Sequence, residues 1–399
     1  MRLPLLVGLS VLVWAPRAGA QQVTEQEFLS AFTPESTAVR ALTEGVARAE
    51  AARRRAGLLS NPRAEFWREQ PDANPRVTNW TLSWVPPLDG RYGLGKKGAA
   101  AGLAAARERL TVDKAELRRE LRAAFAAWSL AFERREALAQ QVARIHSLAE
   151  AERQRARVGE ESGLSARRFT LAEAEVCAAL ATAEAALAKA QALARAWRTD
   201  LAADATPASA SPPEPPPIGG PTDSPEVRAL ALEAEQAAFD RKRSGRFLAF
   251  PTLQFGWQQL ADRGVVRGGP ILAAAWTVPL FDREQPARIE AERREQVAAA
   301  RAELGRARVA AEAEGGAAAY RLLYTASREG GRTSVDSDRV IAAATAAFRA
   351  GEASLTDLLD SLRAAMAARM AEIDLRGQAL EAHRGLETAL GRSLTGGGF

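Results

Sequence analysis

The sequence predicts a mainly α-helical protein with a small β part, organised as two tandem repeats. The composition is rich in Ala, Arg, Glu and Leu and poor in β-branched residues, which favours helices. Between Leu88 and Gly159 there is no Pro, and apolar residues recur every three or four positions, as in a long helix. The chain also repeats itself, because a shift of 192 positions places Trp84 on Trp276 and Gly159 on Gly351.

Length and composition exclude several classes of protein. The chain has 399 residues, 26% of them charged, and no run of 18 apolar residues follows the N-terminus, so a polytopic helical membrane protein is excluded. One Cys and two His (Cys177, His146 and His383) exclude a disulfide framework and a Cys/His metal cluster, so we expect no metal and no cofactor. Basic residues are interleaved with acidic ones, which argues against nucleic acid as a partner.

The N-terminus has the pattern of a cleavable signal peptide over residues 1–20. Arg2 precedes an apolar stretch from Leu3 to Trp14, and Ala18-Gly19-Ala20 offers a small-x-small cleavage site. The alternative is a cytosolic N-terminal helix. No Cys lies near the cleavage site, so we expect an exported protein without a lipid anchor.

The repeat predicts the order of domains. We expect a first repeat over 21–201, a Pro-rich linker over 202–222 and a second repeat over 223–399. The first repeat contains a helix over 24–58, strands over about 62–86 and a helical hairpin over about 97–201. The second contains strands over about 249–280 and a hairpin over about 283–391. Two glycine pairs are expected to break its long helix: Gly315-Gly316 and Gly330-Gly331.

The predicted strands alternate between large apolar and polar residues. The segments between paired strands (69–77 and 259–269) carry Pro, Gly, Asp and Asn, as loops do. We expect strands over 78–85, around 252–258 and over 271–278. Their large apolar side chains would share one face: Trp80, Leu82, Trp84, Leu253, Phe255, Trp257, Leu272 and Trp276.

Two strand pairs cannot close a sheet, and their apolar face needs a cover. One solution is a transmembrane β-barrel assembled from several chains, with these residues facing lipid. The other is a small soluble β-sandwich that buries the same face. The alternation alone leaves both open.

Four segments resemble TolC-type outer-membrane efflux proteins. They are the helix-breaking Asn61-Pro62, LSWVPPLDG from Leu82 to Gly90, WTVPLFD from Trp276 to Asp282, and FRAGEASLTDLLD from Phe348 to Asp360. The resemblance covers essentially the whole chain after residue 20. It implies a homotrimer with a 12-stranded β-barrel in the outer membrane of a Gram-negative bacterium and an α-helical tunnel in the periplasm. It also implies a passive, non-enzymatic conduit for efflux or type I secretion, with outer-membrane lipid around the barrel. Its partners would be a periplasmic adaptor and an inner-membrane efflux pump or ABC exporter.

The two hairpin turns repeat the pattern Arg-x-Gly-Glu. A hairpin needs a residue that tolerates positive φ, so Gly by itself indicates only a turn. The resemblance adds that such tips contact the adaptor. The candidate docking residues are Arg157, Gly159, Glu160, Arg349, Gly351 and Glu352.

Asp357 and Asp360 follow the second turn and lie three residues apart on one helical face. One interpretation is a capping box with Ser354 at the start of the helix. The resemblance suggests a second, in which these carboxylates from three chains form a ring that gates the entrance for cations. The first repeat has Ser165 and Arg168 at the corresponding positions, so only the second repeat would contribute to the ring.

A periplasmic adaptor (membrane-fusion protein) is the main alternative function, because it also contains a long helical hairpin. Adaptors carry one hairpin between β-rich lipoyl halves, whereas this sequence predicts two hairpins and little other β-structure. A periplasmic coiled-coil scaffold does not explain the alternating Trp residues. No His/Ser/Asp or metal-ligand pattern indicates an enzyme.

Overall fold

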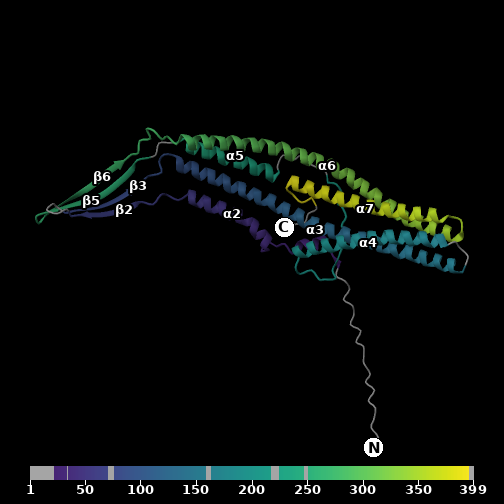
Figure 1. Cartoon of the computed structure of the whole chain (residues 1–399). Helices are drawn as coiled ribbons and strands as arrows, with labels where there is room; N and C mark the ends of the chain where they lie inside the picture. The colour runs from purple at the N-terminus through teal and green to yellow at the C-terminus, as the bar shows by residue number, and fades with distance from the viewer. Residues whose placement is uncertain are drawn as a thin grey trace, which may run out of the picture. The chain divides into compact units, whose positions relative to one another are not determined.

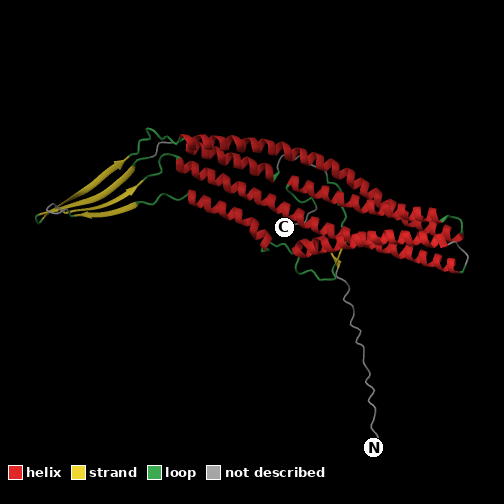
Figure 2. Cartoon of the chain, viewed as in Figure 1, coloured by secondary structure: helices red, strands yellow, loops and turns green. Residues whose placement is uncertain are grey.

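A computed structural model describes residues 22–33, 35–70, 76–158, 163–216, 224–246 and 250–394, except for the side chain of Ser334. The predicted signal peptide, two predicted tip residues (Gly159 and Glu160) and the second part of the predicted linker (217–222) lie outside these ranges. The structure confirms the predicted class, since long helices dominate and one small antiparallel sheet accompanies them (Figures 1 and 2).

The same order of elements occurs twice: a helix, two strands, a very long helix and a return helix. The elements of the first half are α1 (Glu25–Ser30), α2 (Thr37–Ala56), β2 (Arg63–Glu69), β3 (Arg76–Trp84), α3 (Arg91–Arg157) and α4 (Gly163–Trp197). The elements of the second half are α5 (Pro225–Ser244), β5 (Thr252–Asp262), β6 (Val265–Ala275), α6 (Gln285–Ala350) and α7 (Leu355–Leu390). Two short strands, β1 (Gln22–Val23) and β4 (Thr206–Pro207), form a separate parallel pair.

The chain divides into two compact units, each built from segments of both halves. The hairpin unit comprises Met1–Ala31, Glu120–Pro212 and Leu323–Glu381. The strand unit comprises Phe32–Arg119, Pro213–Leu322 and Ala382–Phe399. The helices α3, α6 and α7 contribute residues to both units. No helix in the described part of the chain is both long and apolar enough to cross a membrane.

The hairpin unit has an apolar core between α3, α4 and α7. Its buried members are Ile145, Leu148, Ala149, Phe169, Ala172, Leu358, Leu359 and Leu362. Within each helix these positions recur at three- or four-residue spacing, which places them on one face. A second group joins α1 to α3, because the rings of Phe28 and Phe125 lie 5.7 Å apart. The start of the linker also packs here: Ser129 Oγ donates to Ala208 O (2.8 Å) and accepts from Ala210 N (3.0 Å).

In the strand unit, α5 packs between the first parts of α3 and α6. Ion pairs join the three helices: Arg109–Glu233 (2.9 Å), Arg228–Glu108 (2.9 Å), Arg241–Glu295 (2.5 Å) and Arg308–Glu226. Small residues allow the close approach, since a Cβ at Gly102 would meet the side chain of Gln236 on α5. The buried Tyr320 and His383 rings, 5.0 Å apart, join α6 to the end of α7.

Two helix predictions were wrong. The helix expected over 24–58 is two helices, with α1 ending at Ser30 and α2 starting at Thr37. The sequence between them contains Pro34, which cannot donate a helical hydrogen bond, and Ser36 caps α2 through its side chain.

The glycine pairs 315–316 and 330–331 do not break α6, which is helical throughout. Gly330 lies against α7, where an added Cβ would come within 3.6 Å of the Glu372 side chain. That distance is an ordinary van der Waals contact, so the position would accept a Cβ.

Candidate functional site

The four main strands form one antiparallel sheet in the order β2-β3-β5-β6, and they lie side by side in that order in Figure 1. The turn between β5 and β6 is shorter than the sequence predicted. The strands continue to Asp262 and from Val265, and only Arg263 and Gly264 connect them. Both residues have positive φ (45° and 86°), as the two central residues of a type I′ hairpin turn require.

The register places the large apolar residues on one face of the sheet. Directly paired residues of antiparallel strands point to the same side. One row contains Phe66, Trp80 and Trp257, and the rings of Phe66 and Trp80 lie 4.3 Å apart. The next row contains Ala64, Leu82, Phe255 and Leu272.

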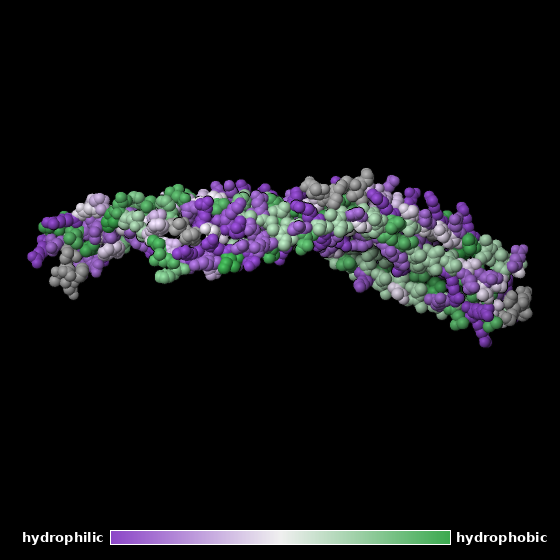
Figure 3. All heavy atoms as spheres, turned by 90° about the horizontal axis from the view of Figure 1, so that it is seen from above, coloured by the Kyte–Doolittle hydropathy of each residue, from purple (hydrophilic) through white to green (hydrophobic). Residues whose placement is uncertain are grey.

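This apolar face is open to the surroundings of the chain. Trp80 is 57% exposed and Leu272 is 78% exposed, while Trp84 and Leu253 are half-buried at one end of the sheet. Figure 3 shows hydrophobic atoms beside hydrophilic ones over the strands, at the left of the view. Exposed apolar surface of this kind marks an interaction with a membrane or another protein.

The opposite face mixes polar residues with apolar ones, since Trp67 and Ile271 also lie on it. It carries Asn79, Thr81 and Ser83 from β3, and Gln254 and Gln258 from β5. Asn79 and Thr81 are only 9% and 8% exposed. The sheet therefore has one face with exposed large apolar side chains and one face on which most of the polar side chains of β3 and β5 lie.

Trp276 lies one residue beyond the end of β6 rather than in the strand over 271–278 that the sequence predicted. The pairing ends at Thr252 and Ala275. The next residue on the β5 side is Pro251, which has no amide hydrogen to donate. Trp276 is nevertheless exposed, as a lipid-facing residue would be.

The outer edges of β2 and β6 pair with no other strand in the described ranges. An open edge presents unpaired backbone N–H and C=O groups that favour pairing with another chain. The four strands alternate in direction, so β6 of one copy and β2 of the next would also be antiparallel.

The second hairpin turn is defined by hydrogen bonds at both of its helix ends. Gly351 has a φ of 78°, its amide donates to Phe348 O (3.1 Å), and the amide of Glu352 donates to Ala347 O (2.9 Å). These two bonds form a Schellman motif, which ends α6. Arg349, Gly351 and Glu352 are exposed.

The corresponding first turn is described only in part. Arg157 is the last residue of α3 and is exposed, whereas Gly159 and Glu160 lie outside the described residues.

The structure separates the roles of the two acidic residues that follow the second turn. Asp357 Oδ2 accepts hydrogen bonds from Ser354 Oγ (2.6 Å) and Ser354 N (3.2 Å), and Ser354 Oγ accepts from Asp357 N (3.2 Å). This is a capping box, and its hydrogen bonds lower the pKa of Asp357 below the ordinary value of 3.8. Asp360 is exposed, and the described residues offer it no hydrogen bond or ion pair. Its carboxylate is therefore available to solvent and ions.

Polar contacts join α4 to α7 beside these acids. Arg168 Nη1 donates to Thr356 Oγ1 (3.3 Å), and Arg363 pairs with Glu175 (2.9 Å). Arg168 is the first-repeat residue that corresponds to Asp360 of the second repeat. Through Thr356 it contacts the residue that precedes Asp357.

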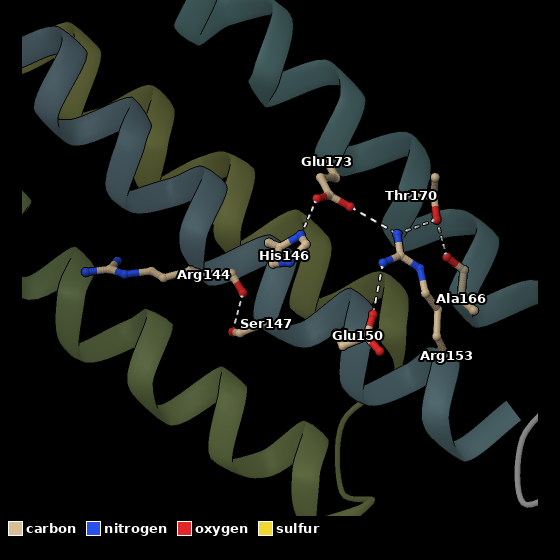
Figure 4. A network of polar contacts seen from close by, with 8 residues as sticks. All are labelled: Arg144, His146, Ser147, Glu150, Arg153, Ala166, Thr170 and Glu173. Carbon is tan, nitrogen blue, oxygen red and sulfur yellow. Dashed lines mark hydrogen bonds and ion pairs between the residues drawn. The ribbon is translucent and has the colours of Figure 1, made fainter. Parts of the chain in front are cut away.

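A polar network joins α3 to α4 near the first turn (Figure 4). Glu173 on α4 accepts hydrogen bonds from His146 Nδ1 (2.6 Å) and from Arg153 (3.2 Å), both on α3. Arg153 also contacts Thr170 Oγ1 and Glu150, each at 3.3 Å. The hydrogen bond from His146 is the main cause that lowers the pKa of Glu173 below 4.5, and burial opposes it.

Sequence spacing did not predict this network, because His146 has no partner at metal-ligand spacing and its contact with Glu173 joins two different helices. The sequence did contain a signal for this contact. His146 and Glu173 lie about equally far from the turn at 158–163, and a helical hairpin brings such positions together. No group of three or more His, Cys, Asp or Glu side chains suited to a metal occurs among the described residues.

Three solved structures show the fold to which this chain is similar. One is CusC, whose structures concern folding and transmembrane channel formation. The TM-score is 0.77 with 15% identity, over 92% of this chain and 92% of that one. For the outer membrane protein VceC from Vibrio cholerae, the TM-score is 0.71 with 16% identity, over 92% of this chain and 95% of that one. For the MtrE outer membrane channel of Neisseria gonorrhoeae, the TM-score is 0.70 with 17% identity, over 93% and 89%.

No protein-family model matches the sequence, and a comparison with curated proteins finds no match. The structural similarity extends over nearly the whole length of all three proteins and includes both halves of the chain. The chain therefore has the fold of these outer-membrane channel proteins.

Proposed function

We propose that this protein is the outer-membrane channel of a tripartite efflux or type I secretion system. It works as a homotrimer in a Gram-negative outer membrane, after export by a cleavable signal peptide and without lipidation. Solute passes through it from a periplasmic adaptor and an inner-membrane efflux pump or ABC exporter. It is a passive conduit and not an enzyme, so the inner-membrane partner supplies the energy.

The sheet carries this proposal. Four strands with two open edges and an exposed apolar face do not form a complete structure in water. Three copies would supply 12 strands, and the alternating directions allow antiparallel pairing all around the ring. The apolar face then contacts lipid, every edge is paired, and the opposite face, with Asn79, Thr81 and Gln258, lines a lumen.

The hairpin turns support a docking role at the periplasmic end. Arg349, Gly351 and Glu352 are exposed on a turn held by a Schellman motif and a capping box, so their positions are well defined. We propose that this turn and its first-repeat counterpart (Arg157, Gly159 and Glu160) contact the adaptor. The carboxylate of Asp360, with Asp357 beside it, narrows the entrance and selects for cations.

Cysteine crosslinking between strands tests the trimeric barrel. In a Cys177→Ala background, each chain receives one cysteine on β2 and one on β6, both on the apolar face. The positions are Ala64 or Phe66 on β2, and Leu272 or Ala274 on β6. If β6 pairs with β2 of the next copy, at least one combination of a β2 and a β6 cysteine gives covalent dimers and trimers in membranes. Cysteines at the same depth on β3 and β5, such as Leu82 and Phe255, crosslink only within one chain.

A water-soluble monomer with no crosslinks between chains in any combination would contradict the barrel. That result would favour the periplasmic adaptor, which needs no membrane strands.

A further inference from the structure

We propose that the helix ends beside the sheet form a basic collar that binds the phosphate groups of anionic phospholipids. Six side chains make up this collar: Arg53, Arg54 and Arg55 at the end of α2, Lys97 near the start of α3, and Lys242 and Arg243 at the end of α5. The inference rests on the proposed function, because it requires that the sheet crosses the outer membrane. It adds a class of lipid, and the residues that bind it, to that function.

Both halves of the chain carry the same basic pattern where a helix ends ahead of a strand pair. Residues 53–57 read Arg-Arg-Arg-Ala-Gly, and residues 241–245 read Arg-Lys-Arg-Ser-Gly, with the glycine at the C-cap of the helix in each case. The stretches 51–62, 90–98 and 241–251 hold three, three and four basic residues and no acidic residue. Positive charge is therefore concentrated at this level, in a chain whose formal net charge is only +5.

Contacts within the strand unit bring these helix ends to one level beside the sheet (Figure 1). The hydroxyl of Tyr92, in the first turn of α3, donates to Gly57 O at the end of α2 (2.6 Å). A Cβ added to Gly95 on α3 would lie 3.5 Å from Nη1 of Arg243 on α5. The residues at the start of α6 (281–290) carry both signs of charge and do not belong to the collar. The collar is therefore one surface built from three helix ends.

The charge of the collar is not neutralised within the chain. All six side chains are exposed, and none forms an ion pair with an acid in the part of the chain that the structure describes. Lys242 lies over the ring of Phe239 (5.6 Å), a contact that leaves its charge in place. Arg241 differs, because it pairs with Glu295 (2.5 Å), and it is not counted in the collar. The six collar cations are therefore available to an anionic surface.

Exposed apolar side chains fill the step between the sheet and the collar. In the loops beside the strands, Leu58, Leu88 and Phe281 are 70%, 70% and 93% exposed. Arg53 precedes Leu58 by five residues, about 7–8 Å at a helical rise of about 1.5 Å per residue. The headgroup layer on each side of the hydrocarbon core is about 5–8 Å thick. The order of apolar sheet, apolar loops and basic helix ends therefore matches hydrocarbon, its boundary and the phosphate layer.

The helix dipole explains only part of this pattern. Basic side chains in a last helical turn interact favourably with the negative end of the dipole, which applies to α2 and α5. The dipole explains neither Lys97, which lies near the N-terminal end of its helix, nor the exposed apolar loops. A layer of anionic headgroups on the periplasmic side of the membrane explains both.

Native mass spectrometry of the purified full-length protein in detergent tests the collar. Phosphatidylglycerol and phosphatidylethanolamine with the same acyl chains are titrated separately, and the lipids bound to intact trimers are counted. The proposal expects a preference of at least about fivefold for phosphatidylglycerol, since each basic residue near an anionic membrane surface contributes about that factor.

Paired substitutions localise the binding. Arg54→Gln/Arg55→Gln and Lys242→Gln/Arg243→Gln each remove two charges from the collar, and each should lower the preference for phosphatidylglycerol severalfold. The matched control is Arg301→Gln/Arg306→Gln, which removes two exposed charges of α6 at least 16 residues beyond its start at Gln285. The control should keep the preference of the wild type.

Trimers that bind both lipids equally, or equal losses in the collar variants and the control, would overturn the collar and leave the channel proposal unchanged. A role in the helix dipole alone predicts that result, with a lower thermal stability of the collar variants. Absence of trimers would overturn the collar together with the channel.

Discussion

At the residue scale, Gly256 has the least room for a side chain among the glycines of β5 and β6. It pairs with Thr81 on β3, and an added Cβ would clash with the carbonyl oxygen of Trp80 and come within 2.8 Å of Thr81 Cγ2. Because the clash involves backbone, a side-chain rotation cannot relieve it. The pairing of β3 with β5 joins the two halves of the chain in the sheet, so it depends on this residue.

We therefore predict that Gly256→Val strongly reduces the amount of assembled protein in the membrane. The matched control is Gly269→Val on β6, where an added Cβ meets nothing within 4 Å in the chain. Heat-modifiable migration on gels and membrane fractionation measure assembly. Equal assembly of the two variants would show that the backbone of β3 does not lie close enough to Gly256 to exclude a side chain.

The two acidic residues after the second turn, Asp357 and Asp360, have different surroundings. Asp357 is committed to the capping box with Ser354, whereas Asp360 faces solvent. If the pair gates the entrance, Asp360→Ala should reduce cation selectivity severalfold, and Asp357→Ala should reduce it less and mainly loosen the start of α7. Reversal-potential measurements in a salt gradient compare the two variants. Unchanged selectivity in both would leave these residues with a structural role only.

Glu173 makes the hairpin contact dependent on pH. Its pKa is lowered in the folded protein, so its carboxylate stabilises the structure above the ordinary value of 4.5. That stabilisation is lost as pH falls through the folded pKa and the carboxylate takes up a proton. Below pH 4.5, exchange of amide hydrogens in α3 and α4 near the turn should accelerate, by up to about fivefold after correction for intrinsic rates.

The Glu173→Gln variant should exchange faster than wild type at neutral pH and lose this acid-dependent step. An identical pH profile in wild type and variant would show that other groups control the hairpin.

At the element scale, α6 runs without a break through two glycine pairs. Gly315 and Gly331 have nothing within 4 Å of an added Cβ. Gly→Ala in an exposed helix interior adds about 0.5–1 kcal/mol of stability, since Ala loses less backbone entropy. Gly315→Ala and Gly331→Ala should therefore each raise the thermal midpoint of the purified protein. A lower midpoint would indicate that these glycines serve a bend or a close contact that a continuous helix does not require.

The elements differ in how far the sequence could predict them. The alternation around Trp80 and Trp257 identified the apolar face, because period-two patterning records directly which side a residue faces. The turn at Arg263-Gly264 was predicted too long, since a positive φ at Arg263 depends on the pairing of β5 with β6 and not on Arg itself. Gly330 suggested a helix break, although α6 continues through it and packs against α7 near Glu372.

The candidate site shows the same division. The capping box of Ser354 and Asp357 was readable because its partners are three residues apart. The contacts of His146 with Glu173 and of Arg168 with Thr356 join different helices, so no local spacing revealed them.

At the scale of the whole molecule, the single chain leaves its sheet incomplete. Its edges are open, and Phe66, Trp80, Phe255, Trp257 and Leu272 lie exposed on one face, opposite Asn79, Thr81 and Gln258. Three copies in a bilayer satisfy both features, because the edges pair and the apolar face meets lipid. The fold shared with known outer-membrane channels agrees with this solution.

The most direct test of this account is the conductance of the purified, detergent-solubilised protein in planar lipid bilayers. We predict discrete, cation-selective channels from a preparation that crosslinks as a trimer. The Gly256→Val variant, which should not assemble, is the matched preparation without channels. A folded, water-soluble monomer that gives no conductance would contradict the conduit and favour a periplasmic adaptor.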